Sequence, residues 1–234
     1  MKKILTVVIP CKNEGFTIKK TINLLNQQAG IKGTKVYVAD NSNDKWFTFH
    51  CIEDAVDDNL SVEIIHGGYP AIARNNGAKR VDTKYILFLD ADMFIKDPNL
   101  IKRLLIKMEK NDLHLLTVKT RTEDGKFNNV YRAFDLIQFL IKFTTPFAVG
   151  GFMLFKKKTF DELGGFNIND KFAEDYHLSS KVNPKKFHID KSIVYTLSRR
   201  FKNKGVWYMT KLMIKTFLNK NNDKFFEKEY GYWS

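Results

Sequence analysis

The sequence predicts an α/β fold with a mostly parallel central sheet, helices on its faces and a helical extension at the C-terminus. Apolar runs with the alternating pattern of strands follow one another along the chain, separated by segments with helical spacing. Polar or acidic loops come directly after several of these runs. In a parallel sheet covered by helices, such loops converge on the edge formed by the carboxyl ends of the strands.

The expected elements follow one another closely. Strands are expected at 4–9, 34–39, 61–66, 84–89 and 152–155, and helices at 16–27, 48–55, 71–80, 176–182 and 206–218. The helix at 71–80 contains mainly small residues, so its Gly77 would let it approach the sheet closely. We divide the chain into a catalytic domain (1–205), with a nucleotide-binding half (1–98) and an acceptor half (99–205), and an extension (206–234).

Length and composition fit one sizeable globular domain with an appendage. The chain has 234 residues, 44% of them hydrophobic, and its 20 Phe predict a large aromatic core. No run approaches the ~20 apolar residues that span a bilayer, and the start at Met-Lys-Lys leads into a short strand rather than a signal peptide. Cys11 and Cys51 lack metal-site spacing and are expected as free thiols. A cytoplasmic protein is therefore expected.

The chain is basic, and most of the excess lies near the C-terminus. Lys and Arg number 39 against 26 Asp and Glu, a formal net charge of +13. From Lys181 onward there are 13 basic and 4 acidic residues, which supply +9 of that excess. This asymmetry predicts an anionic partner, with a generally lysine-rich composition as the alternative. The sequence contains no helix-turn-helix, zinc-finger or RNP-like motif, so nucleic acid is not expected.

Two carboxylates follow the strand at 84–89. Asp90 and Asp92 are two residues apart, so both would emerge on the same side as the strand ends. Carboxylates held close together need a positive partner. Hard oxygen ligands suit Mg²⁺ or Mn²⁺ carrying a diphosphate, and an ordinary acidic turn is the alternative for this triplet taken alone.

Five motifs in order give the chain a family resemblance. They are Pro10-Cys-Lys-Asn-Glu14, Val38-Ala-Asp-Asn-Ser-Asn-Asp44, Ala73-Arg-Asn-Asn-Gly77, Leu89-Asp-Ala-Asp92, and Gly164-Gly-Phe166 followed by Glu174-Asp175. Each is short, but in this order, between residues 4 and 205, they make the chain resemble the family 2 glycosyltransferases. The resemblance implies the GT-A fold, inverting transfer from a nucleotide-diphosphate sugar, and a role in cell-envelope polysaccharide synthesis.

The resemblance assigns nucleotide binding to the first half of the chain. Asp40 would contact the nucleobase and ribose, with an Asx turn as the alternative, and Ala39 stands where many relatives carry another Asp. Arg74, expected at the start of its helix, would reach the base or the diphosphate unless it pairs with a nearby acid. The loop under the base would be formed by Pro10, Lys12 and Glu14, with helix capping by Asn13 as the rival explanation.

For the acidic pair, the resemblance implies that Asp92 coordinates the metal and that Asp90 contacts the ribose or a metal-bound water, with Ala91 between them in the donor site. The ion, Mn²⁺ or Mg²⁺, would stabilise the departing nucleoside diphosphate. Many relatives carry a histidine just before a later Arg-Arg pair. That histidine is missing before Arg199-Arg200, and His188 is expected as a strand residue. Diphosphate and water would complete the metal shell.

Asp175 is the expected general base. An inverting displacement needs a carboxylate that takes the proton of the acceptor hydroxyl, and Asp175 occupies the family's position for it. Glu174 would raise the pKa of Asp175 if both were desolvated, and capping of the following helix is an additional role. Gly150 and Gly151 would bring backbone close to the donor sugar or acceptor, or are ordinary turn glycines. Arg199 and Arg200 belong to the same acceptor region.

Two segments of the second half bear on the acceptor. The helix at 206–218 is basic and amphipathic, and it would either lie on an anionic bilayer or pack against the catalytic domain. The aromatic-rich segment at 131–147 would border the acceptor groove or supply core. Contact with the inner face of the membrane through the C-terminal helix therefore stays open.

We expect metal-assisted transfer of one sugar from a nucleotide diphosphate, UDP before GDP or dTDP, to a hydroxyl of a saccharide or lipid-linked acceptor. Two other classes remain as alternatives. A sugar-phosphate nucleotidyltransferase would share the sheet, but no Gly-rich basic loop follows the first strand. A non-catalytic anion-binding module would explain the charge but not the ordered acidic loops.

Overall fold

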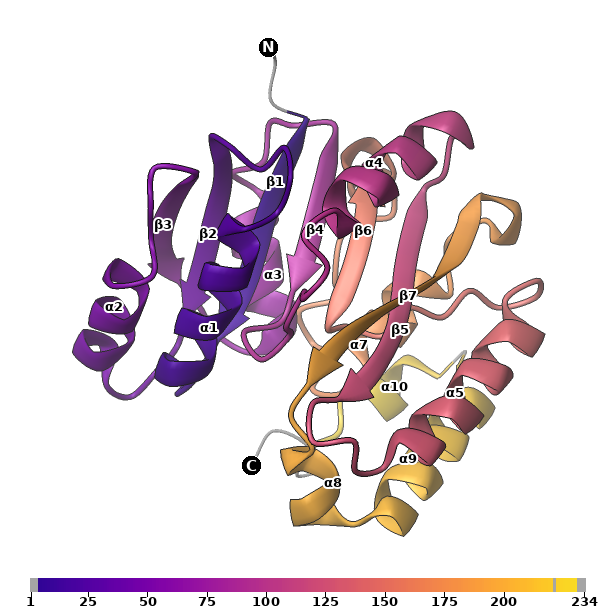
Figure 1. The fold of residues 1–234 in the computed structure, drawn as a ribbon. Coiled ribbons are helices and arrows are strands. Elements are labelled where there is room, and N and C mark those ends of the chain that lie inside the picture. Colours follow the sequence, from indigo (N-terminus) through magenta and orange to yellow (C-terminus); the bar gives the residue numbers. More distant parts are fainter. Residues whose placement is uncertain (1–3, 221, 231–234) are drawn as a thin grey trace.

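A computed structural model describes residues 4–220 and 222–230, and seven strands of this part form one sheet in the order β3-β2-β1-β4-β6-β5-β7 (Figure 1). The strands are β1 (Leu5–Cys11), β2 (Thr34–Asp40), β3 (Leu60–His66), β4 (Tyr85–Leu89), β5 (Leu115–Thr122), β6 (Phe152–Lys156) and β7 (Phe187–Thr196). Strand β6 runs antiparallel to both of its neighbours, and the other pairs are parallel. The predicted mostly parallel sheet is confirmed.

Helices cover both faces of the sheet. They are α1 (Gly15–Asn26), α2 (Lys45–Glu53), α3 (Pro70–Ala78), α4 (Leu100–Lys110), α5 (Asn128–Ile141), α6 (Lys157–Glu162), α7 (Glu174–Ser179), α8 (Arg199–Lys204), α9 (Val206–Leu218) and α10 (Asp223–Phe226), with a 3₁₀ turn at Pro184–Lys186. The helix predicted at 206–218 is confirmed to the residue. The helix predicted at 48–55 begins earlier, because the Asp44 side chain accepts from the amide of Phe47 and caps its start.

Alternating side chains of each strand divide the core into two layers. On one face, Val7 and Leu87 pack with α1 and α4; on the other, Val8 and Phe88 pack with α3 and the segment around Phe166. Helix α3 lies very close to the sheet, since a Cβ at Gly77 would overlap the side chain of Val8. The close approach expected from its small residues is therefore confirmed.

The end of β1 is open on one side, which explains how a proline fits there. Pro10 pairs with Ala39 of β2, whereas the pairing of β1 with β4 stops at Val8. Since the pairing of β1 with β4 has ended before Pro10, its missing N–H costs the sheet little. The strand thus extends to Cys11, two residues past the predicted end, and carries the start of the first polar loop to the sheet edge.

A third apolar cluster joins the C-terminal helices to the acceptor half. Leu212 of α9 and Phe226 of α10 pack with Phe147 and Tyr176. The inner face of α9 therefore packs against the rest of the chain, as one of the two alternatives predicted, while Trp207 on its outer face is 87% exposed. Within the described residues, no helix combines the length and the apolar character needed to cross a bilayer. The division of the chain at residues 98 and 205 stays a prediction.

Candidate active site

The loops after β1, β2 and β4 meet at one edge of the sheet, as the sequence predicts. The side chain of Asp40, at the end of β2, is buried, and its Oδ1 accepts from the backbone amide of Ser42 at 3.0 Å and from the Ser42 hydroxyl at 2.6 Å. This is the Asx turn that had been the alternative for Asp40. The Ser42 hydroxyl also accepts from the backbone amide of Asn13 at 2.7 Å, so Asp40 fixes the loop after β1 as well.

Asn13 does not cap helix α1. Its backbone is left-handed (φ 57°), a conformation that Asn tolerates better than most residues, and its side chain accepts from the amide of Asn43 at 2.9 Å. The capping role considered for Asn13 is therefore wrong, since Glu14 is the residue that precedes α1. Lys12 is exposed at the tip of the same loop.

Glu14 and Arg199 lie together although they are far apart in sequence. The Arg199 guanidinium is paired with the Glu14 carboxylate, and it lies 4.0 Å from Asp92 Oδ2. A bridge between Phe94 and Tyr195 holds the loop after β4 beside the carboxyl end of β7. This places the start of α8 next to the acidic pair.

Asp90 and Asp92 fit a divalent cation that is also bound by a substrate. Burial and the neighbouring Asp90 raise the pKa of Asp92 to about 6, with Arg200 and Arg199 opposing the rise. A cation would relieve this crowding of negative charge. Within residues 4–220 and 222–230, no group of three or more His, Cys, Asp or Glu side chains is placed to hold a metal. Two carboxylates suffice for Mg²⁺ when substrate phosphates and water supply the remaining oxygens.

His188 lies far from this pair. It is the second residue of β7, whereas the loop carrying Asp92 contacts the other end of that strand through Tyr195. The prediction that His188 is a strand residue is confirmed.

Arg74 connects the acidic pair to the candidate base. It lies in the middle of α3, not at its start as predicted, and is 1% exposed. Its Nη2 donates to Asp90 Oδ1 at 2.6 Å, and its Nη1 donates to Glu174 Oε1. Burial alone would lower the pKa of Arg74, but the surrounding carboxylates raise it above its usual value, so the guanidinium stays charged. The structure thus shows the ion pair that had been the alternative to ligand contact.

Asp175 is oriented by two backbone amides. Its Oδ2 accepts from Gly150 N at 2.6 Å and its Oδ1 accepts from Tyr176 N at 2.8 Å. A Cβ at residue 150 would lie 2.9 Å from Asp175 Oδ2, so only glycine permits this approach. Gly151 contributes its carbonyl, which accepts from Asp90 N at 3.1 Å. Burial raises the pKa of Asp175, and the Arg74 guanidinium opposes that rise.

Asn75 is a site residue that motif reasoning did not single out. Its Nδ2 donates to the carbonyl of Phe166 at 2.7 Å, and its Oδ1 accepts from the amide of Phe166 at 3.0 Å. This pair of bonds ties α3 to the Gly164-Gly165-Phe166 turn. Its position beside Arg74 in the same motif was the only hint in the sequence.

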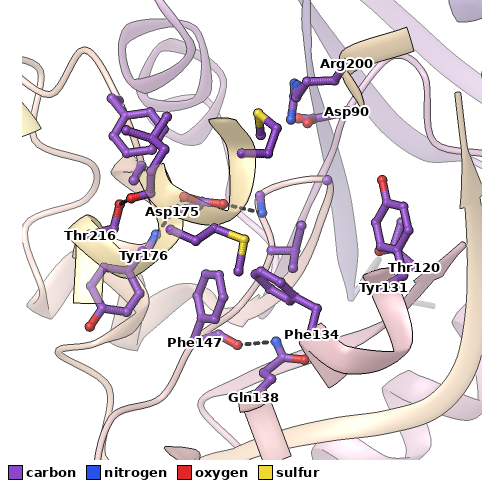
Figure 2. A pocket seen from close by; sticks show the side chains of 18 of the residues that line it. Asp90, Thr120, Tyr131, Phe134, Gln138, Phe147, Asp175, Tyr176, Arg200 and Thr216 are labelled. Atoms are coloured by element: carbon purple, nitrogen blue, oxygen red, sulfur yellow. Dashed lines mark hydrogen bonds between the residues drawn. The ribbon is translucent and has the colours of Figure 1, made fainter. Parts of the chain in front are cut away.

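A cavity of about 160 Å³ opens beside Asp175, between helices α5, α7 and α9 (Figure 2). Asp90, Arg200 and Tyr131 lie toward one end of it, and Phe134, Phe147 and Tyr176 lie toward the other (Figure 2). The aromatic-rich segment at 131–147 thus supplies both cavity wall and core. The arrangement places the carboxylates of Asp175 and Asp90 and the guanidinium of Arg74 around one space.

Comparison with known proteins identifies the chain. Residues 6–164 match the family described as glycosyl transferase family 2. The chain belongs to glycosyl transferase family 2. A curated member similar to it is the O-antigen chain rhamnosyltransferase RfbN of Salmonella typhimurium, 26% identical over 196 residues. That match covers 76% of this chain and 60% of the relative, so the chain spans about 60% of the length of that relative.

Solved structures show that this family 2 chain has the GT-A fold. The mannosyltransferase PcManGT from Pyrobaculum calidifontis, in complex with GDP-Man and Mn²⁺, is similar with a TM-score of 0.67 and 16% identity, over 96% of this chain and 64% of that one. S. aureus TarS 1-349 in complex with UDP-GlcNAc is similar with a TM-score of 0.65 and 20% identity, over 84% of this chain and 59% of that one. Glucosyl-3-phosphoglycerate synthase from Mycobacterium tuberculosis, in complex with Mn²⁺ and UDP-Glc, is similar with a TM-score of 0.61 and 14% identity, over 94% of this chain and 80% of that one.

Proposed function

We propose that this protein transfers one sugar, with inversion, from a nucleoside-diphosphate donor to a hydroxyl of a saccharide or lipid-linked acceptor. The observation that carries the proposal is the single guanidinium of Arg74, which joins Asp90 at the donor edge to Glu174 beside Asp175. The candidate base Asp175 and one carboxylate of the acidic pair, Asp90, are thereby held in one cluster. The related O-antigen chain rhamnosyltransferase supports a saccharide acceptor of the cell envelope.

In the proposed reaction, Asp175 accepts the proton of the acceptor hydroxyl as its oxygen bonds to the anomeric carbon. The bond from that carbon to the diphosphate oxygen breaks, and the nucleoside diphosphate leaves with the electron pair. Each Asp175 oxygen has two acceptor positions, so the amides of Gly150 and Tyr176 fix the carboxylate and still leave room for the hydroxyl. Its raised pKa makes Asp175 a stronger base than an ordinary aspartate.

The donor would bind at the sheet edge where the loops after β1, β2 and β4 meet. Asp92 and Asp90 would hold Mn²⁺ or Mg²⁺, which supplies neutralisation of the charge that develops on the leaving diphosphate. Arg199 and Arg200 add positive charge beside Asp92. Asp40, Pro10, Lys12 and Glu14 would line the nucleotide, with UDP as the first choice and GDP or dTDP as others. Structural neighbours in complex with UDP-Glc and with GDP-Man support the class of donor.

We place the protein in the cytoplasm, with contact at the inner face of the membrane through the outer face of α9. That face carries Trp207, Ile214 and Leu218 together with Lys211 and Lys215. A basic amphipathic helix of this kind binds anionic lipid.

A screen of donors tests the proposed function. Thermal shift with UDP-, GDP- and dTDP-sugars in the presence of Mn²⁺ should identify one donor, and removal of Mn²⁺ with EDTA should abolish most of the shift. With water replacing the acceptor, slow turnover should release a nucleoside diphosphate and a sugar whose first-formed anomer, observed by NMR, is inverted. Release of pyrophosphate would instead indicate a nucleotidyltransferase. Failure to bind any nucleotide would indicate a non-catalytic module.

A further inference from the structure

The cavity beside Asp175 changes character along its length. Figure 2 shows two of its charged lining groups, Asp90 and Arg200, toward one end. The others are Arg74, Glu174 and Asp175, which belong to the same charged cluster, and Asp135 of α5, which is paired with Arg121. The remaining lining is mainly hydrocarbon and aromatic, contributed by Val130, Phe134, Phe147, Phe172, Met209, Leu212, Met213 and Phe217. A ligand that fills this space therefore meets a polar end and an apolar end.

Two polar side chains deeper in the cavity already donate to backbone carbonyls. Gln138 Nε2 donates to the carbonyl of Phe147, and Thr216 Oγ1 donates to the carbonyl of Leu212 at 2.9 Å. Most of the lining in this part is hydrocarbon or aromatic, so a sugar would bury hydroxyls against groups that cannot hydrogen-bond to them, which is costly. A hydrocarbon group has no such requirement.

The cavity size fits a short apolar segment. The volume of the whole cavity, polar end included, is about 160 Å³, and a benzene-sized group of about six carbon atoms fits a cavity of roughly 150 Å³. We propose that this cavity holds the apolar chain next to the reacting hydroxyl of an amphiphilic acceptor. The inference rests on the proposed function and narrows its acceptor to a lipid-type alcohol or glycolipid.

The outer faces of α5 and α9, two of the helices that wall the cavity, indicate where this acceptor comes from. On α5 and just beyond it, Leu136, Phe139, Leu140 and Phe143 are exposed, the last two at 65% and 69%. Lys142 lies over the rings of Phe139 and Phe143 at 4.5 and 4.7 Å. The outer face of α9, described above, likewise exposes apolar side chains with lysines beside them.

A helix that is apolar on its inner and outer sides needs a partner on both. The lysines beside these exposed apolar residues indicate which partner covers the outer sides. In a bilayer that contains anionic lipids, the lysine cations would lie at the headgroups and the apolar side chains below them. The cavity would then receive its acceptor from that bilayer.

The apolar part of the proposal is tested with a soluble amphiphile. Calorimetry of the full chain should show octyl glucoside, below its micelle concentration, binding at least tenfold more tightly than methyl glucoside. Met213→Trp, which fills the cavity from α9, should abolish that preference, and the volume-conserving Met213→Leu should keep it. Val130→Phe fills the cavity from α5 and serves as a second, independent variant.

Equal binding of the two glucosides, or a preference untouched by both filling variants, would overturn the inference. Binding of UDP with Mn²⁺ should be unchanged in all these variants. Loss of that nucleotide binding in the unaltered chain would contradict the proposed function alone, because the octyl preference is measured without nucleotide.

Vesicles test the source of the acceptor. The protein should co-sediment with vesicles of equal parts phosphatidylglycerol and phosphatidylcholine but not with phosphatidylcholine alone. The double substitution Leu140→Glu with Phe143→Glu should reduce binding at least tenfold. Ile106→Glu, at a similarly exposed apolar residue of α4, is the matched control and should have no effect. Equal loss in both variants, or no binding to anionic vesicles, would contradict the membrane as source.

Discussion

The proposed donor edge, which carries Asp40, Asp90 and Asp92, and the cavity beside Asp175, which we propose for the acceptor, are built in different ways. At the proposed donor edge, Asp40 ends a strand and Asp90 and Asp92 follow closely after one, and short-range bonds such as that from Ser42 to Asp40 hold the loops in place. The acceptor cavity has walls from three helices that are distant in sequence, and it is held together by the packing of rings such as Phe147 against Phe134 and Phe217.

The difference suggests a division of tasks, in which the strand ends would hold the donor and the helix faces would recognise the acceptor. Strand ends place side chains at the edge of the sheet where ligands of α/β proteins bind, which suits the holding of a diphosphate. Helix faces can be rebuilt by side-chain substitution without disturbing the sheet, which suits recognition of a particular acceptor. Arg74 is a buried point of contact between the two regions, since it bonds to Asp90 in one and to Glu174 in the other.

Substitution of the base should have the largest effect on activity. Asp175→Asn removes the proton acceptor, so the rate of transfer should fall on the order of 10²- to 10⁴-fold. Its side-chain carbonyl can still accept one of the two backbone amides, so the fold should persist. Calorimetry of UDP with Mn²⁺ should give an unchanged affinity. Transfer at an undiminished rate would show that the base lies elsewhere.

The pH profile gives a second measure of the same residue. Asp175 acts in its deprotonated form, and burial raises its pKa. Activity should therefore be present above that raised pKa and be lost as the pH falls through it. The acid limb of the rate profile should lie above about 4, the ordinary pKa of an aspartate. A limb at or below that value would contradict the buried environment of the base.

Removal of the bridge should affect both regions together. Arg74→Met leaves Asp90 and Glu174 without their buried partner, which should destabilise the fold by about 3–5 kcal/mol. Arg80→Met is the matched control, because it breaks the exposed pair with Glu63 and should cost at most about 1 kcal/mol. Urea unfolding measures both. Equal costs would show that the Arg74 bridge is no more important than a surface pair.

The sequence was informative about the donor edge for a physical reason. Asp40, Asp90 and Asp92 adjoin strands whose apolar patterns are strong, and the fold rule for parallel sheets brings such ends together. The order of the strands, with antiparallel β6 between β4 and β5, depends on pairing between segments that are distant in sequence. No local pattern of residues indicates it.

The acceptor side was less predictable. The ion pairs of Arg74 join residues up to 100 positions apart, so no spacing revealed them. Likewise, the segment at 131–147 was recognisable as aromatic, but whether its rings line a cavity depends on where α9 packs.

Substitution of a metal-side carboxylate should weaken donor binding. Asp92→Asn should lower the affinity for UDP in the presence of Mn²⁺ by about tenfold or more, since even indirect partners of a metal contribute roughly that much. Binding measured in EDTA should not change, and Asp97→Asn on the surface is a neutral control. If the affinity with Mn²⁺ stays the same, Asp92 is not a ligand and the donor edge binds phosphate through its arginines alone.

The smallest effect is expected where the two regions touch at the surface. Arg199→Gln breaks the pair with Glu14, in which the arginine side chain is 51% exposed. Solvent screens such a pair, so the loss should stay within about 1 kcal/mol, a shift in Tm of about 2–4 °C for a chain of this size. Added salt should reduce the difference between the two proteins, because mobile ions already screen the pair. A larger, salt-insensitive loss would mean that Glu14 and Arg199 form a structural joint, so that the donor loop depends on the acceptor half for its position.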